Sequence, residues 1–255
     1  MLELRNISFK RGNLNIGPIN FSLHPGEILT ICGKNGSGKT STLLALNREI
    51  KPESGEIAIN GRCLKRLKSL EISRYTGYVQ QELPEPLGLN VRDIMEINGF
   101  TRKYDYHDLY NSMEMCGVET FIDRDYSTLS GGEKRMVMIS AVIYQNPEYI
   151  MLDEPSSFLD IDKINLLIKI LKDLRSEGKG ILLVLHDINL AYNISDSIIL
   201  MKDGKIISSG TRDAAVTIKN LEAAYDAKFD SYMSPEGIRF YPLEFRETVK
   251  DIGNL

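Results

Sequence analysis

The sequence predicts an α/β protein with a parallel sheet at its core, an antiparallel β subdomain and a helical insertion. Compact apolar runs, such as residues 28–32 and 149–152, have the length and composition of buried strands. Stretches in which apolar residues recur at helical spacing separate these runs. Because strands that alternate with helices form parallel sheets with both faces covered, the two observations together favour this architecture.

The N-terminal part of the chain is expected to contain strands, a glycine-rich loop and a helix. Alternating apolar residues across 1–31 indicate short strands. A glycine-rich loop starts at Gly33, and the apolar spacing that begins at Thr40 predicts a helix after the loop. Asn60 and Gly61 follow another apolar run and are typical of a two-residue hairpin turn.

The middle of the chain has a different pattern. Strand signals fade over residues 81–146, where helical spacing dominates and Gly117 interrupts it. After Pro147, strands and helices alternate again. We therefore expect one domain over residues 1–255, in which 1–80 and 147–255 form the core with its β subdomain and 81–146 form a helical subdomain.

The C-terminal half repeats the strand and helix signals of a parallel sheet. An amphipathic helix is expected over residues 164–174 and a strand over 181–185. Asp187 is placed to cap the helix that follows this strand. Asp203 and Gly204 predict a second hairpin turn.

Composition excludes several classes of function. The 255-residue chain has 42% apolar and 26% charged residues and a net charge of −4, which is an ordinary globular balance. No run of one charge points to nucleic acid, and no apolar stretch approaches the roughly 20 residues that span a bilayer. The N-terminus lacks the apolar segment of a signal peptide, so we expect a cytoplasmic protein. The cysteines and histidines are scattered, without disulfide or metal-ligand spacing.

The glycine-rich loop fits the pattern G-x-x-x-x-G-K-[ST] in full. Its residues are Gly33, Lys34, Asn35, Gly36, Ser37, Gly38, Lys39 and Thr40, and Ser41 follows them. Glycines let backbone N–H groups approach a polyphosphate, and the next helix directs its positive end toward it. Lys39 supplies a mobile charge for the β- and γ-phosphates, and the Thr40 hydroxyl can bind Mg²⁺. Since a buried strand precedes the loop and a helix follows it, we predict a site for ATP and Mg²⁺ rather than a flexible turn.

Two carboxylates directly follow the strand predicted over residues 149–152. Asp153 and Glu154 would then lie at the carboxyl end of a parallel strand, where open α/β sheets bind ligands. Asp153 is placed to hold Mg²⁺ or its water shell, and Glu154 can polarise the water that attacks the γ-phosphate. Alone, an acidic pair before Pro155 would suit a solvated turn, but the phosphate loop favours the catalytic interpretation.

Residues 129–133, Leu-Ser-Gly-Gly-Glu, resemble the LSGGQ/E signature of ATP-binding cassette (ABC) ATPases. Ser130 and Glu133 also have the spacing of a capping box, and we expect both interpretations to hold, since a capped helix N-terminus with open N–H groups is an anion site. The resemblance covers nearly the whole chain. It implies a P-loop NTPase fold with a RecA-like sheet, a homodimer of ATPase subunits, and contact of Ser130, Gly131 and Gly132 with the nucleotide of the other subunit.

The other motifs of the ABC family occur in this sequence in the same order as in the family. By resemblance, Gln81 senses Mg²⁺ and the attacking water, His186 is the switch histidine that contacts the γ-phosphate, and residues 157–160 form the D-loop at the dimer interface. The sequence departs from the family at Arg11, where an aromatic residue usually stacks on adenine. A guanidinium plane can also stack on a base, and Phe9 on the same strand face is the alternative.

Two stretches resemble a narrower group of ABC ATPases. Residues 186–191, His-Asp-Ile-Asn-Leu-Ala, and residues 89–95 are similar to ATPases that drive import of iron–siderophore, haem, cobalamin or a related metal chelate. This resemblance implies polytopic membrane permease subunits as partners, an extracytoplasmic solute-binding protein in the same system, and a position on the inner face of the membrane. A soluble ABC ATPase for iron–sulfur cluster assembly is the alternative.

The segment after Gln81 is a candidate docking surface for the permease. It clusters apolar and proline residues that a solvated loop rarely collects. They are Leu83, Pro84, Pro86, Leu87 and Leu89. A locally packed loop is the alternative interpretation.

Overall fold

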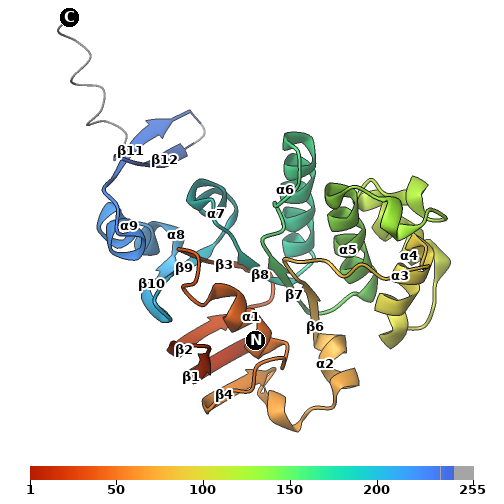
Figure 1. Ribbon diagram of the computed structural model, residues 1–255, viewed down its shortest axis with the longest axis horizontal. Helices are drawn as coiled ribbons and strands as arrows, with labels where there is room; N and C mark the ends of the chain where they lie inside the picture. The colour runs from red at the N-terminus through yellow and green to blue at the C-terminus, as the bar shows by residue number, and fades with distance from the viewer. Residues whose placement is uncertain (236, 244–255) are drawn as a thin grey trace, which may run out of the picture.

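The computed structural model describes residues 1–235 and 237–243 and has a six-stranded sheet at its centre (Figure 1). Strands β9-β3-β8-β7-β6 are parallel in that order, and β10 pairs with the β9 edge antiparallel. The strands are β3 (Ile28–Gly33), β6 (Thr76–Val79), β7 (Tyr149–Asp153), β8 (Gly180–Val184), β9 (Ser197–Lys202) and β10 (Lys205–Thr211). The predicted parallel core is therefore confirmed.

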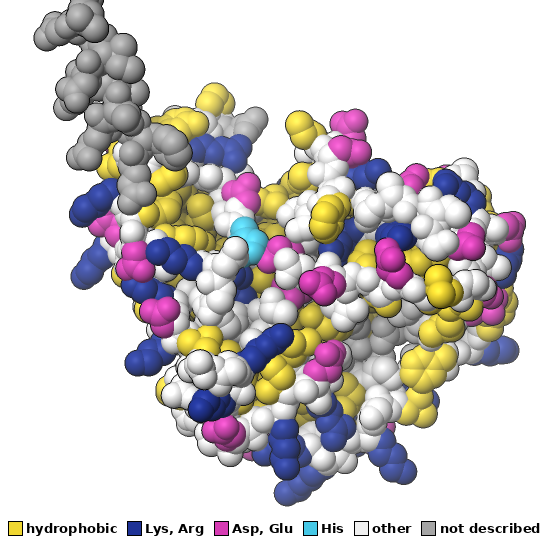
Figure 2. Space-filling view, viewed as in Figure 1, with side chains coloured by type: hydrophobic (Ala, Val, Ile, Leu, Met, Phe, Trp, Pro, Cys, Tyr) yellow, Lys and Arg dark blue, Asp and Glu magenta, His cyan; other side chains and the backbone are white. Residues whose placement is uncertain are grey.

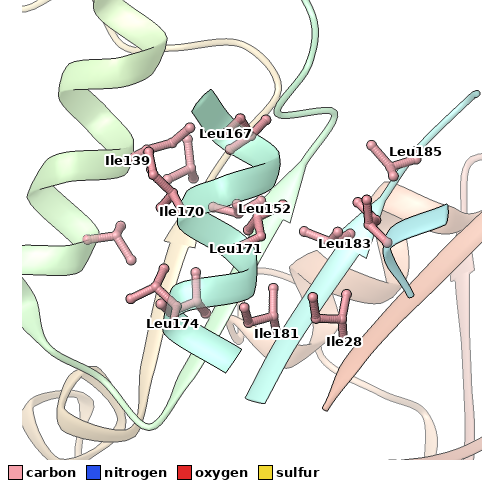
Figure 3. Close-up of a cluster of buried hydrophobic side chains, with 14 of the residues drawn as sticks. Ile28, Ile139, Leu152, Leu167, Ile170, Leu171, Leu174, Ile181, Leu183 and Leu185 are labelled. Atoms are coloured by element: carbon pink, nitrogen blue, oxygen red, sulfur yellow. The ribbon is translucent and has the colours of Figure 1, made fainter. Parts of the chain in front are cut away.

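Apolar side chains of the central strands divide between two cores, because successive residues of a strand point to opposite faces. In β8, for example, Leu183 belongs to one core and Leu182 to the other. Helix α6 (Ile161–Ser176) packs on the first face through one apolar stripe (Figure 3). The buried residues of that stripe are Leu167, Ile170, Leu171 and Leu174.

The second core lies between the central sheet, helix α1 (Lys39–Leu46) and an antiparallel sheet of order β2-β1-β4-β5. These strands are β1 (Leu2–Arg11), β2 (Leu14–Leu23), β4 (Ser54–Ile59) and β5 (Arg62–Cys63). The β4–β5 turn has φ of 50° at Asn60 and 74° at Gly61, and the β9–β10 turn has 47° at Asp203 and 77° at Gly204. Two consecutive positive φ values are what this hairpin turn requires, so both predicted turns are confirmed.

Between β6 and β7 the chain is helical. It forms α3 (Val91–Asn98), α4 (Tyr106–Met115) and α5 (Gly131–Gln145), joined by short 3-10 turns. Figure 1 shows these helices gathered at one side of the central sheet, whereas α2 (Ser69–Tyr75) leads into β6. The interval coincides with the helical stretch expected over residues 81–146, and its status as a separate subdomain stays a prediction.

The chain beyond β10 forms elements that the sequence patterns did not predict. They are α8 (Arg212–Ala215), α9 (Ile218–Tyr225), β11 (Phe229–Ser234) and β12 (Gly237–Pro242). The last two pair as an antiparallel hairpin, which lies on the side of the sheet away from α3, α4 and α5 (Figure 1). Among the described residues, no helix is both long and apolar enough to cross a bilayer.

Candidate active site

The phosphate loop runs from the end of β3 to the start of α1. Its glycines adopt conformations that disfavour other residues, with φ of 149° at Gly33, 78° at Gly36 and 104° at Gly38. A Cβ at Gly33 would lie 2.1 Å from the backbone oxygen of Met201, whereas one at Gly36 would meet no atom of the described residues within 4 Å. The loop is therefore packed against β9 at Gly33 and open at Gly36, where an anion can approach the backbone.

The N-terminus of α1 is available to an anion. Its N-cap is Gly38, which provides no side-chain hydrogen bond, and the first turn contains no acidic residue. The buried ammonium of Lys39 donates to the carbonyl oxygens of Gly33 at 2.9 Å and Lys34 at 3.0 Å. Burial lowers the pKa of Lys39, while the nearby carboxylates of Glu154 and Asp153 oppose that change. This concentration of donors and positive charge suits a polyphosphate.

A pocket of about 710 Å³ lies in front of the loop and contains most of the predicted site residues. It is lined by Arg11, Leu14, Asn35, Gly36, Gly38, Lys39, Thr40, Ser41, Gln81, Glu154 and His186. Leu14 is the lining residue that the sequence patterns missed. Figure 2 shows a histidine beside acidic side chains near the middle of this face.

Asp153 ends β7 with a fully buried carboxylate. Neither of its oxygens has a hydrogen-bond partner among the described residues. Burial raises the pKa of Asp153, although the neighbouring Thr40 hydroxyl opposes the rise. Mg²⁺ typically binds one or two protein oxygens, phosphate oxygens and water. The unpaired carboxylate beside a hydroxyl therefore fits Mg²⁺ bound together with a nucleotide.

Glu154 is the point at which the predicted catalytic residues meet. Its Oε2 accepts a hydrogen bond from Gln81 Nε2 at 2.9 Å and one from the Ser157 hydroxyl at 3.3 Å. His186 Nε2 contacts the other oxygen, Oε1. Glu154 itself has a φ of 49°, an uncommon left-handed conformation for a glutamate, and its N–H donates to Val184 O at 3.0 Å. Tertiary contacts thus aim this carboxylate into the pocket.

The two candidates for base stacking lie in different environments. Arg11 is exposed at the pocket rim, where its Nη1 donates to Ser41 Oγ at 3.1 Å. Phe9 is only 2% exposed and pairs opposite Ile16 between β1 and β2. Its ring belongs to the core and is not available to a base, so the structure favours Arg11.

The signature residues lie outside this pocket. Ser130 caps α5, and its Oγ accepts from Glu133 N–H at 3.3 Å while Glu133 Oε2 accepts from Ser130 N–H at 2.7 Å. The predicted capping box is therefore confirmed. Ser130 and Gly131 are exposed, whereas Gly132 is buried under the D-loop, where a Cβ would lie 2.8 Å from Phe158 O.

Arg135 is a residue of the site that the sequence patterns did not reveal. It is 1% exposed and donates from Nη1 to Gln80 O and from Nη2 to Gln81 O, both at 2.6 Å. Burial lowers its pKa, which the carboxylates of Asp153 and Glu154 oppose. The sequence did contain one signal for this role. Arg135 lies in the apolar stripe of α5 together with Ile139, and a charged residue in a buried stripe needs a partner.

The comparisons with known proteins agree with this geometry. The family described as ABC transporter matches residues 16–157, which is more than half of the chain. The hemin import ATP-binding protein HmuV of Rhizobium meliloti is 30% identical over 92% of this chain and 95% of its own length. The petrobactin import ATP-binding protein YclP of Bacillus subtilis is 31% identical over 89% and 93%. The solved dimeric structure of a bacterial ABC transporter cassette superposes with a TM-score of 0.75 at 26% identity, over 83% of this chain and 99% of that one.

The chain therefore belongs to the ABC transporter family and is an ATP-hydrolysing cassette with a P-loop NTPase core. The resemblance to the import ATPases for haem and siderophores, first indicated by residues 186–191, is confirmed by these relatives.

Proposed function

We propose that this chain is the ATP-hydrolysing subunit of an importer for a metal chelate, such as haem or an iron–siderophore complex. The observation that carries the proposal is the convergence of Gln81, Glu154 and His186 in the pocket of the phosphate loop. The relatives named for hemin and petrobactin import support the class of solute.

The proposed reaction assigns each group of the pocket a task. The phosphates of ATP lie against the open backbone of the phosphate loop, where Lys39 offsets their charge. Thr40 and Asp153 would hold Mg²⁺, which would supply positive charge to offset the negative charge of the phosphates. Glu154 accepts a hydrogen bond from the attacking water, and Gln81 and His186 fix the position of its carboxylate.

Two copies of the chain are needed to complete each site in this proposal. Ser130 and Gly131 present an exposed, capped helix N-terminus, yet they do not line the pocket of their own chain. A second copy arranged head to tail would bring this N-terminus to the γ-phosphate. The dimeric cassette that superposes on this chain supports such an arrangement.

The cytoplasmic side of a permease would dock on exposed apolar side chains in and near the helical segment of residues 81–146. Leu87 is 89% exposed, whereas Leu83 and Leu89 are partly buried against the core, so Leu87 is the leucine of this segment that is most available to a partner. Other exposed apolar residues occur on α2, on α3 and in the turns that follow α3. They are Leu70, Ile97, Phe100 and Tyr104.

Purification from the native membrane tests this function. A tagged chain should bring down a polytopic membrane protein, and uptake of haem or an iron–siderophore complex should stop when Glu154 is replaced by Gln. A solute-binding protein encoded with the same permease would complete the proposed importer. Recovery of iron–sulfur scaffold proteins in place of a permease would favour the assembly ATPase instead.

A further inference from the structure

The C-terminal hairpin contacts the chain directly behind the switch histidine. Asn189 lies in the first turn of α7 (Ile188–Ile194), which begins just after His186. Its Nδ2 donates to Phe240 O at 3.0 Å, and its Oδ1 accepts from Phe240 N–H at 2.8 Å. One side-chain amide therefore pairs with both polar backbone groups of a residue in β12.

Aromatic packing accompanies this amide contact. Phe240 is buried, and its ring lies edge-on to Tyr192 with centroids 5.3 Å apart and an interplanar angle of 74°. The Tyr192 hydroxyl donates to Asp213 Oδ1 at 2.5 Å, which ties α7 to α8 as well. The rings supply apolar contact, whereas the two hydrogen bonds fix orientation because they are directional.

The segment before the hairpin reaches the phosphate loop. Asp226, which follows α9, accepts a hydrogen bond from Lys34 of the loop at 3.2 Å and contacts Lys202 of β9. The rings of Tyr225 and Phe229 pack together at 5.8 Å and join α9 to β11. One continuous stretch of chain thus touches both the phosphate loop and the helix after the switch histidine. Since the Asp226 ion pairs are exposed and contribute little, the Asn189 contact is the stronger constraint.

The orientation of α7 depends on such contacts. The helix spans 7 residues, and a helix this short has little stability of its own. Asp187 caps the helix by accepting hydrogen bonds from the N–H groups of Asn189 and Leu190. His186 therefore lies immediately outside the helix, where its Nε2 contacts Glu154. A rotation of α7 would therefore move His186 relative to Glu154.

We propose that the hairpin of β11 and β12 is a positioning element for His186, and that Asn189 transmits its effect. The inference rests on the proposed function, because it assumes that His186 acts on the ATP bound in the pocket. It gives the C-terminal segment a role in hydrolysis and gives Asn189 a specific structural task.

The test compares ATP hydrolysis by the full-length chain carrying Asn189→Ala with that of the wild type. We expect kcat to fall about fivefold to a hundredfold, because small displacements of reacting groups have effects of this size. ATP affinity should stay within about twofold. The matched control is Asn193→Ala, one turn further along α7, where the side chain borders a separate pocket. This control should keep wild-type turnover.

A double variant separates positioning from a general loss of structure. In a His186→Ala background, Asn189→Ala should add no further loss of kcat, since the group that it positions is already absent. Additive losses, or wild-type kcat in Asn189→Ala, would overturn the inference. If Asn189→Ala does not fold, Asn189→Asp carries the same test, because it keeps the shape and an acceptor for Phe240 N–H. Absence of Glu154-dependent hydrolysis in the wild type would instead reject the proposed function itself.

Discussion

Folding and function make opposite demands on Asp153. Its carboxylate is buried without a hydrogen-bond partner among the described residues, and burial raises its pKa. A carboxyl whose pKa is higher in the folded than in the unfolded chain destabilises the fold as pH rises through the folded pKa. The same negative charge is what Mg²⁺ requires, so Asp153 serves binding at the expense of stability.

Replacing Asp153 with Asn should therefore stabilise the nucleotide-free chain. At pH 8 we expect a gain of about 1–3 kcal/mol in the free energy of unfolding, because a buried charge is removed. The gain should shrink as the pH is lowered toward the pKa of the carboxyl, since Asp153 is then protonated in the wild type. Calorimetry at several pH values measures this, and Asp162→Asn at the exposed start of α6 is the control. A destabilised variant at pH 8 would contradict the argument.

Arg11 should contribute modestly to nucleotide binding. A cation–π stacking contact is worth about 0.5–2 kcal/mol, so Arg11→Ala should weaken ATP and GTP alike by roughly twofold to thirtyfold. Phe9→Ala should instead lower the free energy of unfolding by about 3–5 kcal/mol, because the ring is in the core. Nucleotide titrations and urea unfolding distinguish the two effects. Unchanged affinity in Arg11→Ala would mean that another group contacts the base.

At the scale of elements, α5 joins two parts of the site. Its N-terminus carries the signature residues. Arg135 from the same helix donates to the backbone carbonyl oxygens of Gln80 and Gln81. Lys134 adds an ion pair with Glu85 at 2.9 Å. Any displacement of α5 should therefore also displace Gln81, which contacts Glu154.

Arg135→Met tests this connection. The change leaves two carbonyl oxygens without their donor and frees the backbone that holds Gln81. We expect turnover to fall more than about tenfold, with ATP affinity nearly unchanged, and Arg135→Lys should recover part of the loss. Lys134→Met is the matched control, because its partner Glu85 is exposed. Equal losses in the two Met variants would argue against a specific role for Arg135.

The sequence predicted the elements whose residues are buried in regular patterns. Strand β8 is buried along its whole length, and the phosphate loop has a fixed pattern, so both were expected from the chain alone. The hairpin of β11 and β12 was not predicted, because most of β11 is exposed and its residues do not alternate between buried and exposed. The role of Arg135 was also not predictable, since periodicity places a residue on a helix face but does not identify its partner. Leu89 was expected in a docking surface, but its side chain packs partly against the core, and a local sequence pattern does not reveal such packing.

At the scale of the whole molecule, the account requires two chains for each reaction. The exposed N-terminus of the signature helix α5, at Ser130 and Gly131, and the D-loop residue Phe158, which is 79% exposed, are surfaces that one chain leaves open. A subunit with Lys39→Ala has a damaged phosphate loop and an intact signature, whereas a subunit with Ser130→Phe has the reverse. A mixed dimer of the two therefore contains one complete site.

Mixed dimers should consequently close around ATP when neither parent does. Differently tagged subunits allow the mixed species to be isolated, and its mass in the presence of ATP can be followed by size-exclusion chromatography. Lys39→Ala is expected to lose ATP affinity by more than about tenfold, because a cation at the phosphates is removed. If the mixture behaves like its parents, the signature does not act across the dimer.

The most direct test of the central claim is hydrolysis by Glu154→Gln. The amide keeps the size of the side chain but cannot accept a proton from the attacking water, so turnover should fall at least about a hundredfold, or several kcal/mol of barrier. ATP affinity should remain, and the ATP-bound dimer should persist on size exclusion. Glu177→Gln, just past the end of α6, should behave as wild type. Turnover near the wild-type rate in Glu154→Gln would contradict the assignment of Glu154 as the catalytic base.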